Sequence, residues 1–410
     1  CSLISRRLLN RQNSLIRHKV NHQLESKVLT IAMVAGETSG DLLAGLLLDG
    51  INQQWLHVQA MGIGGAQMKT RGFTAWWPSE KLAVFGYVDA LLHYREIAGI
   101  RNQLKAKLIA NPPDVFIGVD APDFNLDLEA DLRAAGIKSV HFVCPSIWAW
   151  RAKRVEKLKQ SCDHVLCIYP FEPALLAQHG IAATFVGHPL ASVIPLQPDK
   201  AQARQKLGLQ LDDRVIAVLP GSRLSEIKHL APRYFKAVAS MNNAYTAMKY
   251  IVPTLPQFIP LLQQMARDCG VDSIVQIVSG QSHLSLEACD VTLITSGTAT
   301  LEAALYKRPM VIAYALNGLS YQIMKRKKLQ LWVGLPNILC QKFVVPELLQ
   351  DAATPEALAN ATLAWFDSPE KVADLERQFT ELHHQLKRNT SELAAHAISQ
   401  VLQAIQVPRA

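Results

Sequence analysis

Short, largely apolar runs recur along the chain and alternate with longer segments of helical periodicity. In the first half these runs cover residues 28–35, 57–63, 114–119, 139–143 and 164–168. Runs that are apolar rather than alternating are typical of strands in a parallel sheet, because helices cover both faces of such a sheet. The alternation of strand and helix patterns therefore predicts a series of β-α-β units.

The pattern pauses near residues 187–190 and then begins again. Pro189, Pro195 and Pro198 follow the pause, as is typical of a linker. The second series of apolar runs covers residues 215–219, 248–252, 273–278, 291–295 and 310–313. The chain is therefore predicted to be an α/β protein with two tandem Rossmann-like domains, each a doubly wound parallel sheet, facing a cleft.

The predicted boundaries divide the chain into five parts. They are a basic tail over 1–27, an N-terminal domain over 28–190, a linker over 191–213, a C-terminal domain over 214–345 and a helical region over 346–410. Within the last part the candidate helices cover 357–366 and 370–401. Ligands of doubly wound sheets bind beyond the carboxyl ends of the strands, so polar loops at those ends are the first candidates for chemistry.

The composition is that of a folded protein, and its charge excludes one class of partner. Of the 410 residues, 49% are apolar and 19% are charged, which excludes a disordered chain. The formal net charge is +8, of which residues 1–27 carry +5 and the rest of the chain +3. The chain lacks a basic stripe interleaved with aromatic residues, so nucleic acid is not expected as a partner.

Cysteines and apolar runs indicate the compartment. The seven cysteines are scattered and form no C-x-x-C pair, which is typical of reduced thiols in a cytosol. No stretch of about eighteen apolar residues predicts a membrane-spanning helix. The Arg-rich, acid-poor segment 1–27 has the composition of an organellar transit peptide or a membrane-surface helix, and a poorly ordered tail is the preferred interpretation.

Two polar loops follow strands of the first half. The turn Gly36-Glu37-Thr38-Ser39-Gly40-Asp41 leads into a helix expected near residue 42 and suits an anion or a closely approaching substrate, with a helix cap by Ser39 or Asp41 as the equal alternative. Asp120 ends the strand over 114–119, and Asp123 follows it. A carboxylate at a strand end can act as a general base, whereas two caps for a helix starting near residue 125 are the other interpretation.

Two glycine-containing turns in the second half are suited to phosphate groups. The residues of these turns are Gly221, Ser222 and Arg223 after the first strand, and Ser296, Gly297 and Thr298 after the fourth. Arg223 supplies a permanent planar charge beside free N–H groups, and Glu302 can accept hydrogen bonds from a ribose diol. Together the turns predict a nucleotide diphosphate, although each alone is also a common helix start.

The absence of several known motifs excludes two kinds of site. The chain contains no G-x-x-x-x-G-K-[ST], no D-x-D and no H-E-x-x-H, so neither a nucleotide triphosphatase nor a metal site is predicted. Two segments are candidates for acyl chains or a membrane surface: residues 82–92 and the basic cluster over 325–328 with its apolar neighbours. The residues concerned are Val84, Phe85, Val88, Leu91, Leu92, Lys325, Arg326 and Trp332. A core helix and a solvated helix face are the plainer alternatives.

In order and spacing, eight motifs resemble those of the lipid-A-disaccharide synthase family. They are V-A-G-E-T-S-G-D over 34–41, I-G-G over 63–65, G-V-D-A-P-D-F-N over 118–125, P-S-I-W-A-W-R over 145–151, G-H-P-L over 187–190, L-P-G-S-R over 219–223, S-G-T-A-T-L-E over 296–302 and L-P-N over 335–337. The resemblance implies an inverting glycosyltransferase of the GT-B fold that works without a metal or other cofactor. It also implies a peripheral position at the cytosolic face of the inner membrane.

The resemblance further implies a reaction and roles for residues. The donor would be UDP-2,3-diacylglucosamine, the acceptor 2,3-diacylglucosamine 1-phosphate, and the products a β-1,6-linked disaccharide 1-phosphate and UDP. Asp120 matches the base, Arg223 the diphosphate-binding residue, Glu302 the nucleoside ligand and Asn337 a further active-site residue. The acceptor is expected at Gly36, Glu37, Ser39, Gly40, Asp123 and Trp148, and the donor at the two glycine-containing turns.

Three other functions fit parts of the pattern. A UDP-N-acetylglucosamine 2-epimerase, or another GT-B enzyme, would share the architecture but would not depend on acyl chains. A nicotinamide-dependent oxidoreductase would also have Rossmann-like halves, but no G-x-G-x-x-G follows the first strand of either half. A non-catalytic adaptor at a membrane surface is disfavoured by the paired anion-binding turns.

Overall fold

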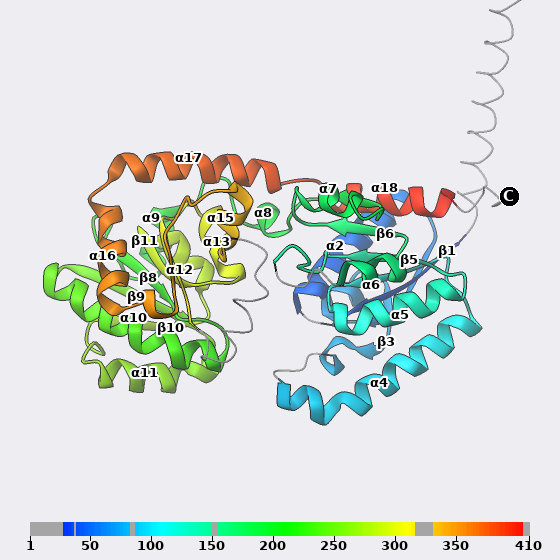
Figure 1. Ribbon diagram of the computed structural model, residues 1–410, viewed down its shortest axis with the longest axis horizontal. Coiled ribbons are helices and arrows are strands. Elements are labelled where there is room, and N and C mark those ends of the chain that lie inside the picture. Colours follow the sequence, from blue (N-terminus) through cyan, green and yellow to red (C-terminus); the bar gives the residue numbers. More distant parts are fainter. Residues whose placement is uncertain (1–27, 37, 83–86, 150–153, 316–330, 405–410) are drawn as a thin grey trace, which may run out of the picture. The chain divides into compact units, whose positions relative to one another are not determined.

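The computed structural model describes residues 28–36, 38–82, 87–149, 154–315 and 331–404, with the backbone alone for Thr38 and residues 87–94. The chain divides into two compact units (Figure 1). The N-terminal unit comprises Cys1–Ile147, Ala152–Pro189 and Arg388–Ala410, and the C-terminal unit comprises Trp148–Arg151 and Leu190–Lys387.

The N-terminal unit is built on a seven-stranded parallel sheet of order β3-β2-β1-β4-β5-β6-β7. Its strands are β1 (Leu29–Ala35), β2 (Val58–Gly64), β3 (Phe73–Pro78), β4 (Val115–Val119), β5 (Lys138–Phe142), β6 (His164–Cys167) and β7 (Ala183–Phe185). The direction in which strands are added reverses between β1 and β4, and ligands of such sheets bind beyond the carboxyl ends at this position.

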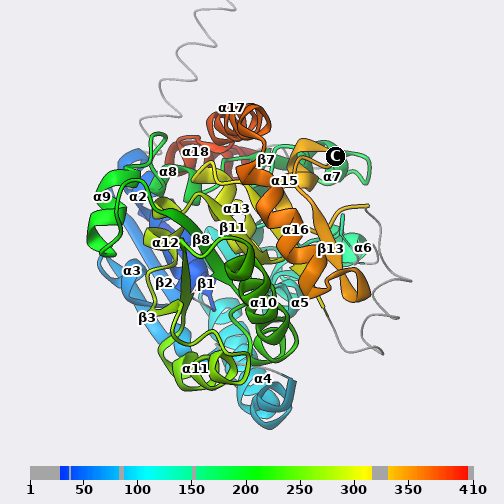
Figure 2. The same ribbon diagram turned by 90° about the vertical axis from the view of Figure 1, so that its left-hand side faces the viewer.

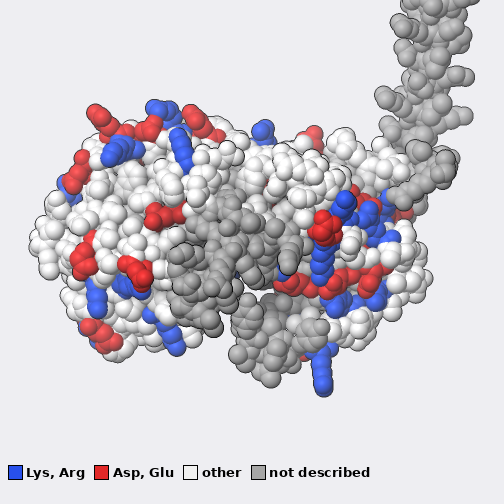
Figure 3. All heavy atoms as spheres, viewed as in Figure 1, with Lys and Arg blue, Asp and Glu red and all other residues white. Residues whose placement is uncertain are grey.

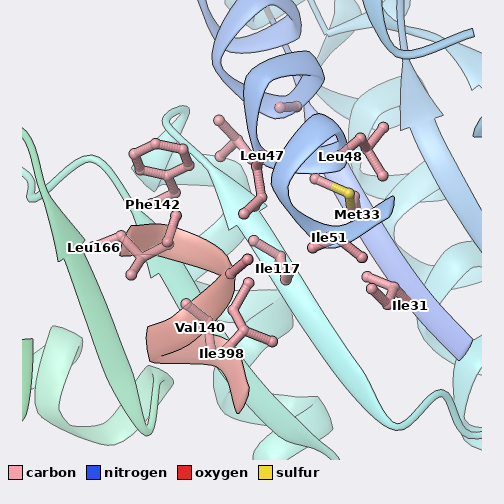
Figure 4. Packing of buried hydrophobic residues seen from close by; sticks show 14 of the residues in the cluster. Ile31, Met33, Leu47, Leu48, Ile51, Ile117, Val140, Phe142, Leu166 and Ile398 are labelled. Carbon is pink, nitrogen blue, oxygen red and sulfur yellow. The ribbon is translucent and has the colours of Figure 1, made fainter. Parts of the chain in front are cut away.

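Helices cover both faces of this sheet. They are α2 (Thr38–Gln54), α3 (Ala66–Lys69), α4 (Tyr87–Ala110), α5 (Pro122–Ala134), α6 (Arg154–Ser161), α7 (Glu172–Ala177) and α18 (Thr390–Gln403), with the 3₁₀ turn η1 (Ser79–Lys81). Ile31 and Met33 of β1 face a core shared with α2 and α18 (Figure 4), while Ala32 and Val34 face a second core shared with α4 and α5. The alternation explains why β1 is apolar on both sides.

The docking of α18 on α2 depends on a glycine. A Cβ atom at Gly50 would lie 2.0 Å from the backbone oxygen of Ser391, far inside van der Waals contact. Ile398 of α18 belongs to the same core as Ile51 and lies beside Val140 (Figure 4). The last described helix of the chain is therefore part of the N-terminal unit.

The C-terminal unit has a six-stranded parallel sheet of order β10-β9-β8-β11-β12-β13. Its strands are β8 (Arg214–Leu219), β9 (Met248–Thr254), β10 (Val275–Ser279), β11 (Val291–Thr295), β12 (Met310–Tyr314) and β13 (Glu347–Leu349). Its helices are α8 (Leu190–Val193), α9 (Lys200–Lys206), α10 (Leu224–Ala244), α11 (Ile259–Asp268), α12 (Ser282–Ala288), α13 (Thr298–Leu305), α15 (Leu335–Cys340), α16 (Pro355–Phe366) and α17 (Pro369–Leu386), with the 3₁₀ turns η2 (Pro256–Phe258) and η3 (Gln350–Ala352). Helices α10 and α16 lie side by side over one face (Figures 1 and 2).

Two doubly wound sheets confirm the expected α/β organisation, while several boundaries differ from expectation. Residues 191–213 include α8 and α9 and belong to the C-terminal unit, and the expected helix over 370–401 is two helices that pack on different units. Helices expected to start near residues 42 and 125 start at Thr38 and Pro122.

The described surface has two features that bear on function. On the face seen in Figure 3, basic and acidic side chains lie interspersed rather than gathered by sign. Among the described residues, no helix is long and apolar enough to cross a membrane. The tail over 1–27 and the residues Glu37, Val84, Phe85, Lys325 and Arg326 lie outside the described residues, and the side chains of Val88, Leu91 and Leu92 are not described.

Candidate active site

A pocket of about 340 Å³ lies at the carboxyl ends of β8, β9 and β11 in the C-terminal unit. It is lined by all seven residues expected to bind a UDP-sugar, which are Gly221, Ser222, Arg223, Ser296, Gly297, Thr298 and Glu302. Two turns that are about seventy residues apart in the sequence are adjacent because β8 pairs directly with β11. The sheet order thus brings both predicted anion-binding turns to one cavity.

Glu226 occupies the first of these turns. Its carboxylate accepts hydrogen bonds from the backbone N–H groups of Ser222 (3.1 Å) and Arg223 (3.3 Å), and from Nη1 of Arg223 (3.0 Å). Gly221 has φ +119°, and a Cβ atom there would lie 2.6 Å from Cβ of Glu226. The Arg223 side chain is 79% exposed. A carboxylate therefore holds the groups that the sequence assigns to a phosphate.

The second turn is tied to the residues that flank α15, the helix that carries Asn337. Oγ of Ser296 donates to the carbonyl of Val333 (2.9 Å), whose own N–H donates to Glu347 (2.9 Å). Asn337 is fully buried, donates to Val345 and Glu347, and accepts from the N–H groups of residues 344 and 345. It does not line the pocket, and its side chain instead joins α15 to residues 344–347.

Glu302 lies one turn into α13, at the wall of the pocket. Burial raises the pKa of its carboxyl above the usual value, and the nearby imidazole of His283 acts in the opposite direction. Nε2 of His283 lies 3.6 Å from Oε2 of Glu302, and the imidazole packs edge-on against Tyr306. A half-buried carboxylate that faces a cavity is a suitable acceptor for sugar hydroxyl groups.

In the N-terminal unit, Asp120 follows the last residue of β4 at the edge where the strand order reverses. Its N–H group donates to the carbonyl of Phe142 on β5 (2.8 Å). Asp120 and Ala121 have φ values of 52° and 42°, in the left-handed region that non-glycine residues seldom adopt. A strained turn thus joins the strand to α5 at the predicted base.

Three residues that the sequence analysis did not assign lie near this turn. Burial raises the pKa of the Tyr169 hydroxyl, and the Glu172 and Asp120 carboxylates add to the rise. Tyr169 stacks on His188 with 5.6 Å between ring centroids, and burial lowers the pKa of His188 to about 4. His188 belongs to the G-H-P-L motif, but only the sheet order brings the end of β6 towards the end of β4.

Asp123 differs from its expected role as a cap. Helix α5 starts at Pro122, and its N-cap residue is Ala121, which has no side-chain acceptor. The Asp123 carboxylate is 82% exposed and forms an ion pair with Arg154 at the start of α6. Trp148, also expected near the acceptor, is half-buried and belongs to the C-terminal unit.

Gly36 and Gly40, on either side of the start of α2, pack against the Asp120 turn. A Cβ atom at Gly36 would lie 3.4 Å from that of Ala121, and one at Gly40 would lie 3.6 Å from the carbonyl of Val119. Ser39 is exposed. Asp41 is buried and accepts from the N–H groups of Gly65, Gln67 and Met68, so it caps α3 rather than its own helix.

The half-buried Trp332 and the exposed Phe343 form an aromatic pair in the C-terminal unit. Their rings meet edge to face with centroids 6.2 Å apart, and Phe343 is 63% exposed.

The described residues include no group of three or more His, Cys, Asp or Glu side chains arranged to hold a metal ion.

Glu226 and Glu347, which hold the two turns, were not predicted from the sequence. A signal for Glu226 was present, because a glutamate three residues after a helix N-cap commonly bonds back to the N-cap N–H. No local signal marks Glu347, which reaches residues 333, 334 and 337 only through the folded loop.

Comparisons with known proteins give a consistent result. The family model described as lipid-A-disaccharide synthetase matches residues 31–398. The lipid-A-disaccharide synthase of Albidiferax ferrireducens is 64% identical over 92% of this chain and 98% of its own length. That of Verminephrobacter eiseniae is 60% identical, over 91% and 97%, and that of Paraburkholderia xenovorans is 51% identical, over 93% and 98%.

Solved structures share the fold at low sequence identity. A UDP complex of MnaA from S. aureus has a TM-score of 0.62 and 11% identity, covering 92% of this chain and 97% of that one. The HepE protein of Anabaena in complex with UDP and glucose has a TM-score of 0.56 and 13% identity, covering 92% and 100%. These likenesses show the α/β fold of the GT-B type.

Proposed function

The chain belongs to the lipid-A-disaccharide synthase family, and from this premise we propose the specific reaction that it catalyses. It is a hexosyltransferase of lipid A synthesis. The proposed donor is UDP-2,3-diacylglucosamine and the proposed acceptor is 2,3-diacylglucosamine 1-phosphate. The products are the β-1,6-linked disaccharide 1-phosphate and UDP.

One observation carries the proposed donor site: the seven residues expected on a UDP-sugar line one pocket of the C-terminal unit. In the proposed complex the diphosphate binds to Arg223 and to the N–H groups of the turn at Gly297, because these groups are donors with a permanent or partial positive charge. The ribose diol donates to Glu302. The Glu226 carboxylate must release the N–H groups of Ser222 and Arg223 where phosphate oxygens take its place.

The proposed acceptor site lies in the N-terminal unit, at the turn that carries Asp120. The 6-hydroxyl of the acceptor loses a proton to the Asp120 carboxylate as its oxygen attacks the anomeric carbon of the donor. The bond from the anomeric carbon to the diphosphate breaks at the same time, and the negative charge of the leaving UDP is stabilised by Arg223. Attack from the face opposite to UDP inverts the anomeric configuration. The chain's own residues supply each of these steps, so we expect turnover without a cofactor.

We also propose that the protein works at the surface of the inner membrane, where its acylated substrates lie. The exposed Leu331, which follows the basic cluster over 325–328 closely in sequence, and the exposed Phe343 support this position, because cations meet lipid phosphates while apolar side chains enter the headgroup layer. An epimerase is not favoured, since the lipid-A-disaccharide synthases are 51–64% identical to the chain whereas the UDP-GlcNAc 2-epimerase of Neisseria meningitidis is 11% identical. A nicotinamide-dependent oxidoreductase is not favoured either, because the relatives that are 51–64% identical to the chain are lipid-A-disaccharide synthases.

The test is an assay of the full chain with both acylated substrates and EDTA present. We expect release of UDP that requires the acceptor, together with a disaccharide product by mass spectrometry. UDP-N-acetylglucosamine without acyl chains serves as the matched control and should not be used. Epimerised sugar, UDP release without acceptor, or activity that EDTA abolishes and Mg²⁺ restores would contradict the proposal.

A further inference from the structure

The turn at Asp120 and Ala121 is held against its own preference. Both residues have left-handed φ values, 52° and 42°, and neither is glycine. Ala121 also precedes Pro122, and a residue before proline normally favours an extended backbone. Such strain persists only where the surrounding structure enforces it.

The side chain of Asn125 is the group that reaches this turn. Nδ2 of Asn125 donates to the carbonyl oxygen of Asp120 at 2.8 Å, and the residue is fully buried on α5. The carbonyl oxygens of Val34 and Val119 also lie 3.5 Å from Nδ2. Three carbonyl oxygens around one atom identify it as the amide nitrogen rather than the amide oxygen.

A buried acid–imidazole pair lies one turn further along α5. Oε1 of Glu129 is 2.7 Å from Nδ1 of His141, and both side chains are fully buried. Gly118 provides the space for this pair and for Asn125. A Cβ atom there would lie 2.1 Å from Oε1 of Glu129 and 2.9 Å from Cγ of Asn125.

This cluster is not explained by stability. Oδ1 of Asn125, Oε2 of Glu129 and Nε2 of His141 are buried, and none has a hydrogen-bond partner among the described residues. Buried polar atoms without partners destabilise a fold, so apolar side chains of the same size would serve a purely structural purpose better. What the polar cluster provides is an amide donor directed at the carbonyl of Asp120.

We propose that Asn125 is a positioning residue for the transfer reaction. Its side-chain amide holds Asp120 and Ala121 in the left-handed turn that presents the Asp120 carboxylate to the acceptor hydroxyl. The Glu129–His141 pair, packed against the same glycine, keeps the Asn125 side chain in place. This inference rests on the proposed role of Asp120 as the base.

The experiment compares Asn125→Ala, Asp120→Asn and the double variant in the full chain. We expect Asn125→Ala to lower kcat at least tenfold while KM for the UDP-sugar changes less than twofold, because the donor pocket lies in the other unit. The double variant should be no slower than Asp120→Asn alone. Ala121→Gly, added to Asn125→Ala, should restore kcat at least threefold, since glycine adopts the left-handed turn without strain.

A matched control separates positioning from stability. Ser161 on α6 is also buried, and its Oγ donates to the carbonyl of Leu126 on α5, the helix that carries Asn125. Ser161 itself is remote from Asp120 in sequence. Ser161→Ala should lower the melting temperature and leave kcat within twofold of the wild type.

The three variants distinguish a wrong positioning role for Asn125 from a wrong assignment of Asp120 as the base. If Asp120→Asn loses turnover but Asn125→Ala stays within twofold of the wild type, the positioning role alone is wrong. A further tenfold loss in the double variant would also overturn it, since Asn125 would then act through something other than Asp120. Near wild-type turnover of Asp120→Asn would overturn the proposed base and this inference with it.

Discussion

Nζ of Lys307 lies 2.8 Å from Nδ1 of His383, and Nε2 of the same imidazole lies 2.8 Å from the carbonyl oxygen of Ala191. All three residues are buried. Lysine has only donors, so Nδ1 of His383 accepts and Nε2 carries the hydrogen that is donated to Ala191. The cluster ties the end of α13 to α8 and α17, near two of the positions where the chain passes from one unit to the other, 189–190 and 387–388.

This cluster predicts a dependence of stability on pH. Burial lowers the pKa of Lys307 from 10.5 to about 8, with Arg308 and Lys387 adding to the effect. The cost of the buried charge is therefore fully present below pH 8 and is relieved as the pH rises towards 10.5. Between pH 7.5 and 9.5 the free energy of unfolding of the wild type should rise relative to Lys307→Met by up to about 2 kcal/mol. A urea-unfolding difference that stays constant over this range would contradict it.

Arg223→Lys keeps a positive charge but loses the planar guanidinium. We expect kcat/KM to fall at least about tenfold, because a charge-assisted hydrogen bond contributes about 1.5–3 kcal/mol. The matched control is Arg214→Lys, since Arg214 lies at the opposite end of β8. Steady-state kinetics of both folded variants give the answer, and equal losses would remove Arg223 from the diphosphate site.

Glu226→Gln should tighten the binding of UDP. Glutamine still offers an oxygen to the N–H groups of Ser222 and Arg223, but it no longer places a negative charge where the diphosphate is proposed to lie. Calorimetry should give a dissociation constant for UDP at least about threefold lower than that of the wild type. Uridine, which lacks phosphates, should bind unchanged. Weaker binding of UDP would mean that the Glu226 contacts persist in the complex.

Glu302→Gln should weaken UDP and uridine alike, by about tenfold, because the proposed contact is to the ribose. Burial raises the pKa of this carboxyl, so in the wild type the accepting carboxylate is lost on acidification at a higher pH than for an ordinary glutamate. The affinity of the wild type for uridine should therefore fall as the pH is lowered, whereas that of Glu302→Gln should not. Parallel pH profiles would contradict the assignment.

Asp120→Asn should lower kcat, whereas Asp123→Asn should change only the stability of the fold. The first removes a base at nearly constant volume, and we expect a loss of roughly 10² to 10⁴ in kcat with UDP binding nearly intact. The second breaks an exposed ion pair with Arg154, which contributes about 0–1 kcal/mol to stability. Single-turnover rates and melting curves measure both. A chemical defect in Asp123→Asn would reverse the assignment.

The central strands were predictable because both of their faces are buried, so that they consist of consecutive apolar residues. All five positions of β4 are buried, and the apolar run predicted it to within one residue. Strands β3, β7 and β13 were missed because they are sheet edges: two have three residues, and Phe73–Pro78 is largely half-buried. Helix α18 follows α17 so closely that helical periodicity alone predicted one continuous helix.

In the candidate site too, residues that belong to a local sequence pattern were predictable, and residues brought together by tertiary structure were not. Gly221 and Gly297 were predicted because a glycine turn between strand and helix is a local pattern. The approach of Tyr169 to Asp120 and the bonds of Asn337 to residues 344–347 arise from tertiary structure, which sequence spacing does not encode. The strain at Asp120 and Ala121 was likewise invisible, since Asp is only a weak signal of a left-handed turn and Ala is none.

Helix α18 also sets an order of events during synthesis. Ile31, Met33 and the apolar side of α2 leave the ribosome early, but the helix that covers them is encoded by residues 390–403. Until that stretch emerges, the N-terminal half of the nascent chain keeps part of its core open to solvent while the entire C-terminal unit is being made. The first sheet to begin folding is thus among the last to be completed. A ribosome that stalls after α2 but before α18 leaves an apolar surface of the N-terminal unit exposed to solvent.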